Sequence, residues 1–215
     1  MASPVERKVG LDFDNTIVSY DALFHALAVR KGLIDASLPV DKATVRDAVR
    51  ALSGGEKTWQ ALQAVAYGSG IHEARLFPGL VAFLDACTAA DAPVFVVSHK
   101  TRYAAADPRG VDLHGCALGF MERHGLFAHG RINPAQVYFE PTRAAKLRRI
   151  HDLGCTHFVD DLPEVLLDDG FPRLTQRIFF SPASTGLLPG TQLTQSWDEI
   201  RSLLFGTGAT RHALS

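Results

Sequence analysis

The sequence predicts an α/β protein with a doubly wound, Rossmann-like parallel sheet of about five strands and an inserted all-helical module. Short apolar runs separated by helix-like stretches favour this fold, because runs without polar alternation suit parallel strands buried on both faces. The insertion is indicated by about sixty residues, 17–76, that contain only helical patterns. A crossover connection between parallel strands needs only about a dozen residues.

The expected strands are rich in β-branched, aliphatic and aromatic side chains. They span residues 8–13, 93–98, 136–139, 156–160 and 176–180. Because strands of this kind alternate with helices, each should join the sheet in parallel to its neighbours.

The expected helices follow from apolar periodicity and from the residues that typically begin and end helices. Pro141-Thr142 opens the best-delimited helix, which runs through Leu153 and stops at Gly154. The other helices of the sheet region span 80–90, 113–124, 162–167 and 196–205, and those of the insertion span 21–31, 41–52 and 56–67. The stretch 99–135 is longer than a crossover requires, and the sequence assigns it no role. The tail 206–215 lacks apolar periodicity, and we expect it to be disordered.

Composition excludes several classes of protein. The chain has 215 residues, of which 47% are hydrophobic, and 22 Lys and Arg against 23 Asp and Glu. This balance argues against disorder and against a nucleic-acid partner. No stretch approaches the roughly 18 apolar residues of a membrane span, and residues 1–8 lack the apolar run of a secretory signal. We therefore expect a cytoplasmic protein with no membrane partner.

The chain has three cysteines at wide spacings, Cys87, Cys116 and Cys155. This odd number and these spacings favour reduced thiols.

Two carboxylates stand two residues apart at the end of the first expected strand. They are Asp12 and Asp14, in the segment Leu11-Asp12-Phe13-Asp14-Asn15-Thr16. In an open α/β sheet the ligand crevice lies beyond the carboxyl ends of the strands, so both acids should reach it. On its own, this pattern of two acids is only weak evidence for a catalytic site.

Further polar residues lie at or beside the same edge of the predicted sheet. Ser98 ends the second strand, and Asp160 and Asp161 end the fourth. Lys146 lies on the helix that leads into the fourth strand. Clustered carboxylates raise one another's pKa unless a counter-charge is present, and a divalent cation together with the lysine would supply it.

The ligand types favour Mg²⁺, because the acids offer hard oxygen atoms and no His or Cys cluster lies nearby in the sequence. A carboxylate nucleophile, a metal, a lysine and a hydroxyl around one phosphoryl group are the parts of a phosphoryl-transfer site.

These motifs, in this order, resemble those of the haloacid dehalogenase (HAD) superfamily. The resemblance covers residues of about 5–19 and 77–205. It implies a HAD-like catalytic core formed by 1–18 and 77–205. It also implies that 19–76 is a helical cap, as in the subgroup whose cap follows the first motif. Such a cap would exclude water and select the leaving group.

The resemblance also implies roles for single residues. Asp12 resembles the nucleophile that becomes an aspartyl-phosphate, and Asp14 resembles the general acid and base. Ser98 resembles the hydroxyl that binds the phosphate group. Lys146 resembles the lysine that stabilises negative charge on the nucleophile and on the phosphate.

The implied Mg²⁺ site consists of Asp12, the backbone carbonyl of Asp14, and the acidic pair Asp160 and Asp161. Which member of that pair binds the metal directly stays open, because one of them could cap the following helix. His99 and Lys100 directly follow Ser98 in the sequence, so we also expect them near the crevice, with His99 contacting the phosphate.

We therefore expect a Mg²⁺-dependent phosphatase acting on a phosphomonoester of a small metabolite. A dehalogenase is disfavoured, since Asp14 is present and family members acting on carbon–halogen bonds typically lack that second acid. One alternative is a phosphonate hydrolase that forms a Schiff base on a cap lysine, for which Lys31, Lys42 and Lys57 are available. Another is a non-catalytic module that binds phosphorylated ligands. The sequence indicates neither the physiological substrate nor the oligomeric state.

Overall fold

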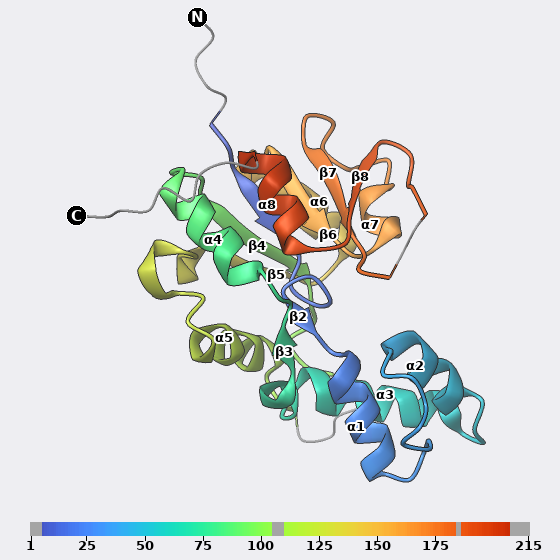
Figure 1. Cartoon of the computed structure of the whole chain (residues 1–215). Coiled ribbons are helices and arrows are strands. Elements are labelled where there is room, and N and C mark those ends of the chain that lie inside the picture. Colours follow the sequence, from blue (N-terminus) through green and yellow to red (C-terminus); the bar gives the residue numbers. More distant parts are fainter. Residues whose placement is uncertain (1–5, 105–109, 184–185, 207–215) are drawn as a thin grey trace, which may run out of the picture.

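A six-stranded parallel sheet forms the centre of the molecule (Figure 1). The computed structural model describes residues 6–104, 110–183 and 186–206. The strand order is β5-β4-β1-β6-β7-β8. The strands are β1 (Val9–Leu11), β4 (Val94–His99), β5 (Val137–Glu140), β6 (His157–Asp160), β7 (Gln176–Phe180) and β8 (Thr191–Thr194). The predicted fold class is confirmed, and β8 is a sixth strand that the sequence did not predict.

The central strand β1 fixes the place of the site. It pairs with β4 on one side and with β6 on the other. The chain therefore builds one half of the sheet and then returns to build the other half, which makes the carboxyl end of β1 a switch point where ligands bind in such sheets. Close packing here requires a glycine, because a Cβ on Gly10 would lie 2.4 Å from the Phe158 ring.

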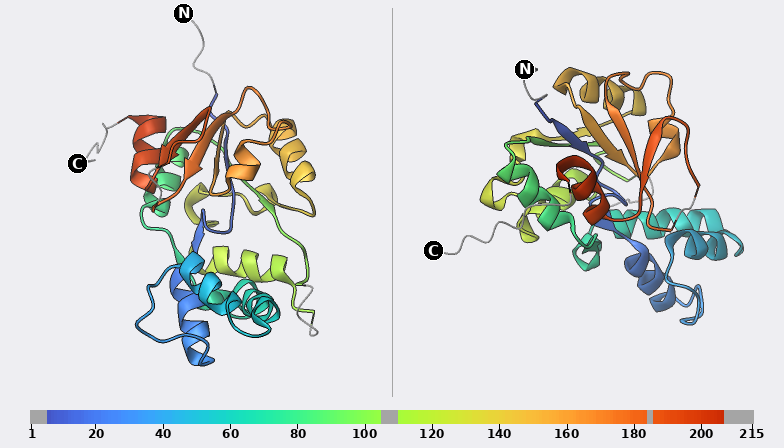
Figure 2. Two further views of the ribbon diagram at one scale, coloured as in Figure 1. Left: turned by 90° about the vertical axis from the view of Figure 1, so that its right-hand side faces the viewer. Right: turned by 45° about the horizontal axis from the view of Figure 1, so that its top comes forward.

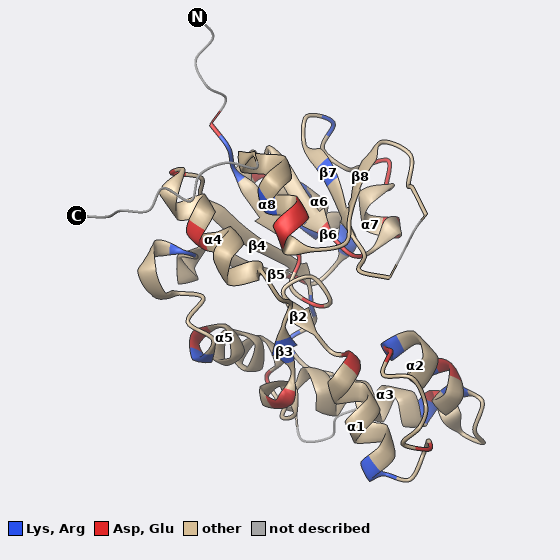
Figure 3. Ribbon diagram, in the orientation of Figure 1, with Lys and Arg blue, Asp and Glu red and all other residues tan. Residues whose placement is uncertain are grey.

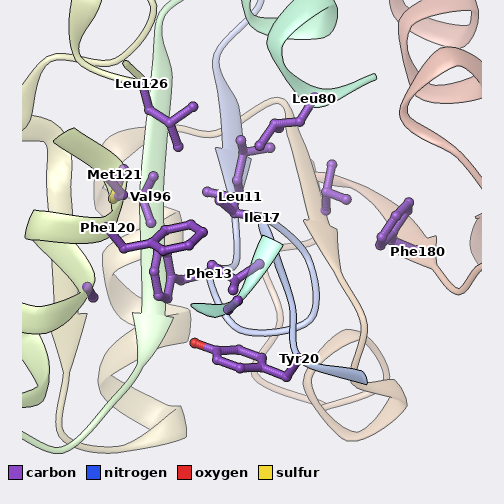
Figure 4. Close-up of a cluster of buried hydrophobic side chains, with 14 of the residues drawn as sticks. Leu11, Phe13, Ile17, Tyr20, Leu80, Val96, Phe120, Met121, Leu126 and Phe180 are labelled. Atoms are coloured by element: carbon purple, nitrogen blue, oxygen red, sulfur yellow. The ribbon is translucent and has the colours of Figure 1, made fainter. Parts of the chain in front are cut away.

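Helices cover both faces of the sheet, and alternate strand residues point to opposite faces. Helices α4 (Leu80–Ala89) and α8 (Trp197–Phe205) cover one face, where Figure 4 shows Leu80 beside Leu11 and Val96. Helices α6 (Arg143–Leu153) and α7 (Pro163–Leu166) cover the other face, against a cluster that includes Phe95, Val97 and Phe158. Both layers are buried, as the apolar strands predict.

The helical insertion follows β1 and hangs below the sheet in Figure 1. It contains α1 (Asp21–Arg30), α2 (Lys42–Arg50), α3 (Gly55–Tyr67) and the short 3₁₀ helix η1 (Ile71–Glu73). The three α-helices lie where the sequence predicts them. The expectation that 17–76 holds no strand is wrong, because β2 (Val18–Ser19) and β3 (Arg75–Leu76) pair antiparallel at the base of the insertion. Strands of two residues are too short to produce a periodic pattern.

The stretch 99–135 supplies helix α5 (Leu113–Arg123) and two 3₁₀ turns, η2 (Ala128–Gly130) and η3 (Pro134–Gln136). Helix α5 contacts α3 and η1, and the left view of Figure 2 shows it beside the insertion. Its Phe120 ring packs edge-on against Phe13, directly after β1. A single apolar core therefore continues from the sheet into the insertion (Figure 4).

Three remaining expectations concern the tail, the membrane and the cysteines. The tail 206–215 lies outside the described residues except for Gly206. Within the described ranges, none of the helices has the length and apolarity needed to cross a bilayer. The cysteines are free thiols, and Cys87 and Cys155 are buried while Cys116 is partly exposed.

Candidate active site

The predicted site residues meet at the carboxyl ends of β1, β4 and β6, between the sheet and the insertion. A cavity of about 560 Å³ lies there, and acidic and basic positions come together in this region in Figure 3. Its lining includes residues of the sheet, of α6, of the segment after β6 and of the insertion. They are Asp12, Asp14, Asn15, Lys42, Tyr67, Ser98, His99, Arg143, Lys146, Asp161, Leu162, Glu164 and Val165. Asp160 lies directly behind this surface, bonded to Lys146.

Lys146 joins two acids in a buried cluster. Its Nζ lies 2.6 Å from Asp12 Oδ1 and 2.6 Å from Asp160 Oδ2. The Lys146 side chain is 1% exposed, and those of Asp12 and Asp160 are 6% and 0% exposed. Burial alone would lower the pKa of Lys146, but the two carboxylates raise it above its ordinary value, so the ammonium stays charged.

The start of helix α6 and the face that the helix buries direct Lys146 into the site. The Thr142 side chain accepts a hydrogen bond from the Ala145 backbone N–H and so caps the helix. The buried face carries Lys146, Leu147 and Ile150, at the spacing of adjacent helical turns. Lys146 therefore points into the protein and not toward solvent, unlike the neighbouring Arg148.

A third acid, Asp161, lies close to the two that Lys146 joins. Asp12, Asp160 and Asp161 each offer a carboxylate oxygen, and these oxygens lie within 4.8 Å of one another. Burial and the neighbouring carboxylates raise the pKa of Asp161 well above its ordinary value, while burial raises that of Asp160 to about 6. Negative charge therefore exceeds what Lys146 offsets, and an all-oxygen donor set fits Mg²⁺.

The two adjacent acids have different surroundings. Asp160 uses one oxygen for Lys146 and accepts a hydrogen bond from the Leu162 backbone N–H on the other at 2.9 Å. Asp161 lines the cavity and interacts with the Asn15 amide. Asp160 is therefore already engaged at the start of the following helix, whereas Asp161 faces the space where a ligand would enter.

Asp14 has its own counter-charge. Lys100 Nζ lies 2.8 Å from Asp14 Oδ2 and 3.0 Å from Oδ1, and the Tyr20 hydroxyl donates to Oδ1 at 2.6 Å. Burial would raise the pKa of Asp14, but Lys100 and the Tyr20 hydrogen bond lower it below its ordinary value. Asp14 is therefore ionised in this arrangement.

Ser98 and His99 differ in exposure. Ser98 is buried and lines the cavity, whereas His99 is exposed at its edge, with Nε2 3.2 Å from the Pro141 carbonyl oxygen. Side chains alternate along a strand, so Ser98 and Lys100 share one direction and His99 takes the other. His99 nevertheless lines the cavity, whereas Lys100 reaches the site through its ion pair with Asp14.

Asn15 and Lys42 also line the cavity, although nothing in the sequence assigned either of them to the phosphatase site. Asn15 follows the two motif acids in the left-handed backbone region, with φ of 55°, which Asn tolerates better than most residues. Its Oδ1 accepts a hydrogen bond from Lys42 Nζ at 3.2 Å. Asn15 could have been found from its place inside the motif. Lys42 was only one of three insertion lysines, and no local pattern distinguishes it.

Comparison with known proteins shows the fold of the HAD hydrolases. No protein-family model and no curated protein matches the chain. Solved structures do match, among them a predicted phosphatase from Clostridium acetobutylicum, with a TM-score of 0.59 and 12% identity over 94% of this chain and 99% of that one.

Two other similar structures contain ions. A HAD family hydrolase from Deinococcus radiodurans R1 with bound phosphate and sodium has a TM-score of 0.56 and 12% identity, covering 94% of this chain and 96% of that one. A putative HAD-hydrolase from Bacillus subtilis bound to magnesium has a TM-score of 0.55 and 14% identity, covering 93% and 98% of the two chains.

Proposed function

We propose that this chain, which has the fold of the HAD-superfamily hydrolases, is a Mg²⁺-dependent phosphatase. It would hydrolyse a phosphomonoester of a small metabolite through an aspartyl-phosphate on Asp12. The observation that carries this proposal is the buried Asp12–Lys146–Asp160 cluster beside Asp161, at the base of a cavity that also holds Ser98.

Asp12 attacks the phosphorus atom, forming a phosphorus–oxygen bond as the bond to the ester oxygen breaks. Lys146 offsets the charge on Asp12 and on the phosphoryl oxygens, and because it is already in place no reorganisation is needed. The Ser98 hydroxyl donates a hydrogen bond to a phosphoryl oxygen. The released alkoxide takes a proton from Asp14.

Water then attacks the phosphorus of the aspartyl-phosphate, releasing inorganic phosphate and restoring Asp12. Asp14 takes the proton from this water, and its ionised state beside Lys100 is the form that can do so. Donation to the alkoxide requires the protonated form. We infer that the Asp14–Lys100 pair loosens when substrate occupies the cavity, and that Asp14 then takes up a proton from solvent, which it donates to the alkoxide.

Asp12, Asp161 and the backbone carbonyl of Asp14 would hold the Mg²⁺, with Asp160 behind them keeping Lys146 in position. The ion supplies positive charge that offsets the phosphoryl oxygens. The donor set supports this assignment, because Asp161 faces the cavity while both oxygens of Asp160 have protein partners.

We further propose that residues 19–76 act as the cap over a core formed by 1–18 and 77–205. Lys42 and Tyr67 of this segment line the cavity opposite the sheet residues. A wall of this kind limits water around the reacting phosphoryl group.

The phosphonate-hydrolase alternative has less support. Lys31 and Lys57 are exposed, so Lys42 is the insertion lysine that reaches the cavity. Burial would lower the pKa of Lys42, but Tyr67, Asp14 and Asp161 raise it above its ordinary value. A Schiff base requires a neutral amine, and this environment favours the charged one.

Rapid-quench labelling tests the function and both motif acids. An activated aryl phosphate carrying ³²P in its phosphoryl group is mixed with wild type, Asp12→Asn and Asp14→Asn. We expect label to accumulate on Asp14→Asn, because a good leaving group needs little protonation while the second step loses its base. Asp12→Asn should carry no label and turn over no substrate, because it lacks the nucleophile.

The exposed acid Asp169 provides a matched control, and Asp169→Asn should behave as wild type. Chelator should abolish turnover and Mg²⁺ should restore it. Label on Asp12→Asn protein, or full activity in excess chelator, would refute the mechanism. Tight binding of phosphorylated ligands without turnover of any phosphoester would instead establish a binding module.

A further inference from the structure

The cavity is lined by three cations, and they differ in how their charge is offset. Lys146 pairs with Asp12 and Asp160, and Arg143 Nε pairs with Asp168 at 3.0 Å. Lys42 is the third. Among the residues that the structure describes, no carboxylate lies within ion-pair distance of the Lys42 ammonium. Its charge is therefore the one that the protein leaves available to a ligand.

Neutral groups hold the Lys42 ammonium in place. Its Nζ lies 3.2 Å from Asn15 Oδ1 and 5.5 to 5.9 Å from the centres of three aromatic rings, those of Tyr20, Phe24 and Tyr67. Ring faces attract a cation without cancelling its net charge. Lys42 is thus positioned by its surroundings and remains positive.

The backbone at Lys42 is also fixed. The Lys42 N–H donates to Asp21 Oδ1 at 3.0 Å, and the Asp41 carboxylate caps α2 by accepting from the Thr44 N–H at 2.7 Å. The first bond ties the start of α2 to α1, and the second caps α2 itself. Little side-chain or backbone freedom remains to be lost when a ligand contacts the ammonium, which favours binding.

Lys42 approaches the cavity from the insertion, whereas Ser98 and Lys146 approach it from the sheet side. If the phosphoryl group binds on the sheet side, the part of the substrate that faces Lys42 is the leaving group. Asp14 and Asp161 also attract this ammonium, but from beyond ion-pair distance: Asp14 pairs with Lys100, and Asp161 interacts with the Asn15 amide.

We propose that Lys42 determines specificity for a leaving group that carries a second anionic group, a carboxylate or a further phosphate. This inference rests on the proposed phosphatase function and names its substrate class. A charge-assisted hydrogen bond from a prearranged ammonium distinguishes such a group from a neutral one of the same shape.

The test uses substrates that differ in the charge carried by the leaving group. They are 3-(phosphonooxy)propanoate, its neutral amide, and propane-1,3-diyl bisphosphate, with the two- and four-carbon homologues of each. For wild type we expect kcat/KM for the best anionic substrate to exceed that of its amide by about 10- to 100-fold. The carboxylate and bisphosphate series show which anion is preferred.

Variants assign the preference to Lys42. Lys42→Met keeps the aliphatic stem against the aromatic rings, and we expect it to reduce the preference to about twofold or less, mainly through KM. Lys42→Arg keeps the charge and should retain a clear preference for the anion. Lys57→Met, which removes an exposed insertion lysine, should leave the preference as in wild type.

The outcomes separate the two proposals. Turnover of the amides as fast as of the anions by wild type would overturn the role of Lys42 and leave the phosphatase function intact. A preference that persists in folded Lys42→Met would do the same. Absence of turnover of every phosphoester, with Mg²⁺ present, would overturn the phosphatase function and with it this inference.

Discussion

The two sides of the cavity hold their lysines in different ways. On the sheet side, Lys146 and Lys100 each lie within 3.0 Å of carboxylate oxygens. On the insertion side, Lys42 contacts an amide oxygen and ring faces. The paired lysines hold the carboxylates in position independently of which ligand binds. A lysine without an acid partner contributes little to the fold and has its charge available for a ligand.

The largest expected effect of this difference is on stability. Lys146→Met leaves Asp12 and Asp160 buried without their counter-charge, and breaking a buried ion pair costs about 3–5 kcal/mol. Lys42→Met breaks no ion pair and should cost about 1 kcal/mol or less. Urea unfolding of both variants measures the contrast. Turnover by Lys146→Met should fall by about 100-fold or more.

Arg148 is exposed on the same helix as Lys146, and Arg148→Met provides the matched control. We expect it to change stability by no more than about 0.5 kcal/mol. Equal losses in Lys146→Met and Lys42→Met would remove the distinction between the two sides.

The second effect depends on metal and pH. In the folded protein, burial raises the pKa of Asp160 from 3.8 to about 6, and burial and the neighbouring carboxylates raise the pKa of Asp161 well above its ordinary value. At pH values above about 3.8, the folded state without metal therefore binds more protons at these two acids than the unfolded state does. Because of this difference, the free energy of unfolding falls as the pH rises from about 4 through the raised pKa values. Mg²⁺ competes with the protons, so it should raise the unfolding temperature more at about pH 7.5 than at about pH 5.

Asp161→Asn should lose most of this Mg²⁺ stabilisation, while Asp169→Asn should keep it. A Mg²⁺ effect that is the same at both pH values would show that Asp161 does not hold the ion.

The smallest expected effect comes from the tyrosines at the boundary between the two sides. Tyr20→Phe removes the hydrogen bond to Asp14 but leaves Lys100 in place, and should cost about 1 kcal/mol of stability.

The two tyrosines should also differ in their effects on activity. Tyr67→Phe removes the hydroxyl that interacts with Lys42, so it should alter the preference for anionic leaving groups. It should leave the acid limb of the pH–rate profile unchanged. Tyr20→Phe should move that limb to higher pH, since it removes a bond that lowers the pKa of Asp14. Identical profiles for both variants would contradict the assignment.

The sheet side could be predicted because its chemistry is attached to regular elements. Asp12, Ser98 and Asp160 each stand at the end of an apolar strand, and parallel strands bring such ends to one edge. Strand alternation would also have placed the Lys100 side chain on the same side as that of Ser98. The strand β8 was missed because Thr191–Thr194 is polar and lies at the edge of the sheet.

The insertion side could not be predicted to the same depth. Its helices follow from periodicity, but the place of Lys42 depends on how α2 packs on α1 and on rings from α1 and α3. These contacts are tertiary, and nothing in the sequence around Lys42 distinguishes it from Lys31 or Lys57. The burial of Lys146 could not be predicted from its helix alone either, because the neighbouring arginines suggest a face exposed to solvent.

The pairing of β2 with β3 has a consequence for protein engineering. Val18 faces Leu76 and Ser19 faces Arg75, so the two chain ends of the insertion already lie side by side. A foreign segment could be joined there without a long linker and with little loop-closure cost. The continuous core adds a second requirement, because Phe120 of α5, which contacts the insertion, belongs to the apolar cluster that continues into it. A successful replacement must therefore supply an apolar surface that covers this face of α5, and exchange of this segment is a problem of core packing as much as of connectivity.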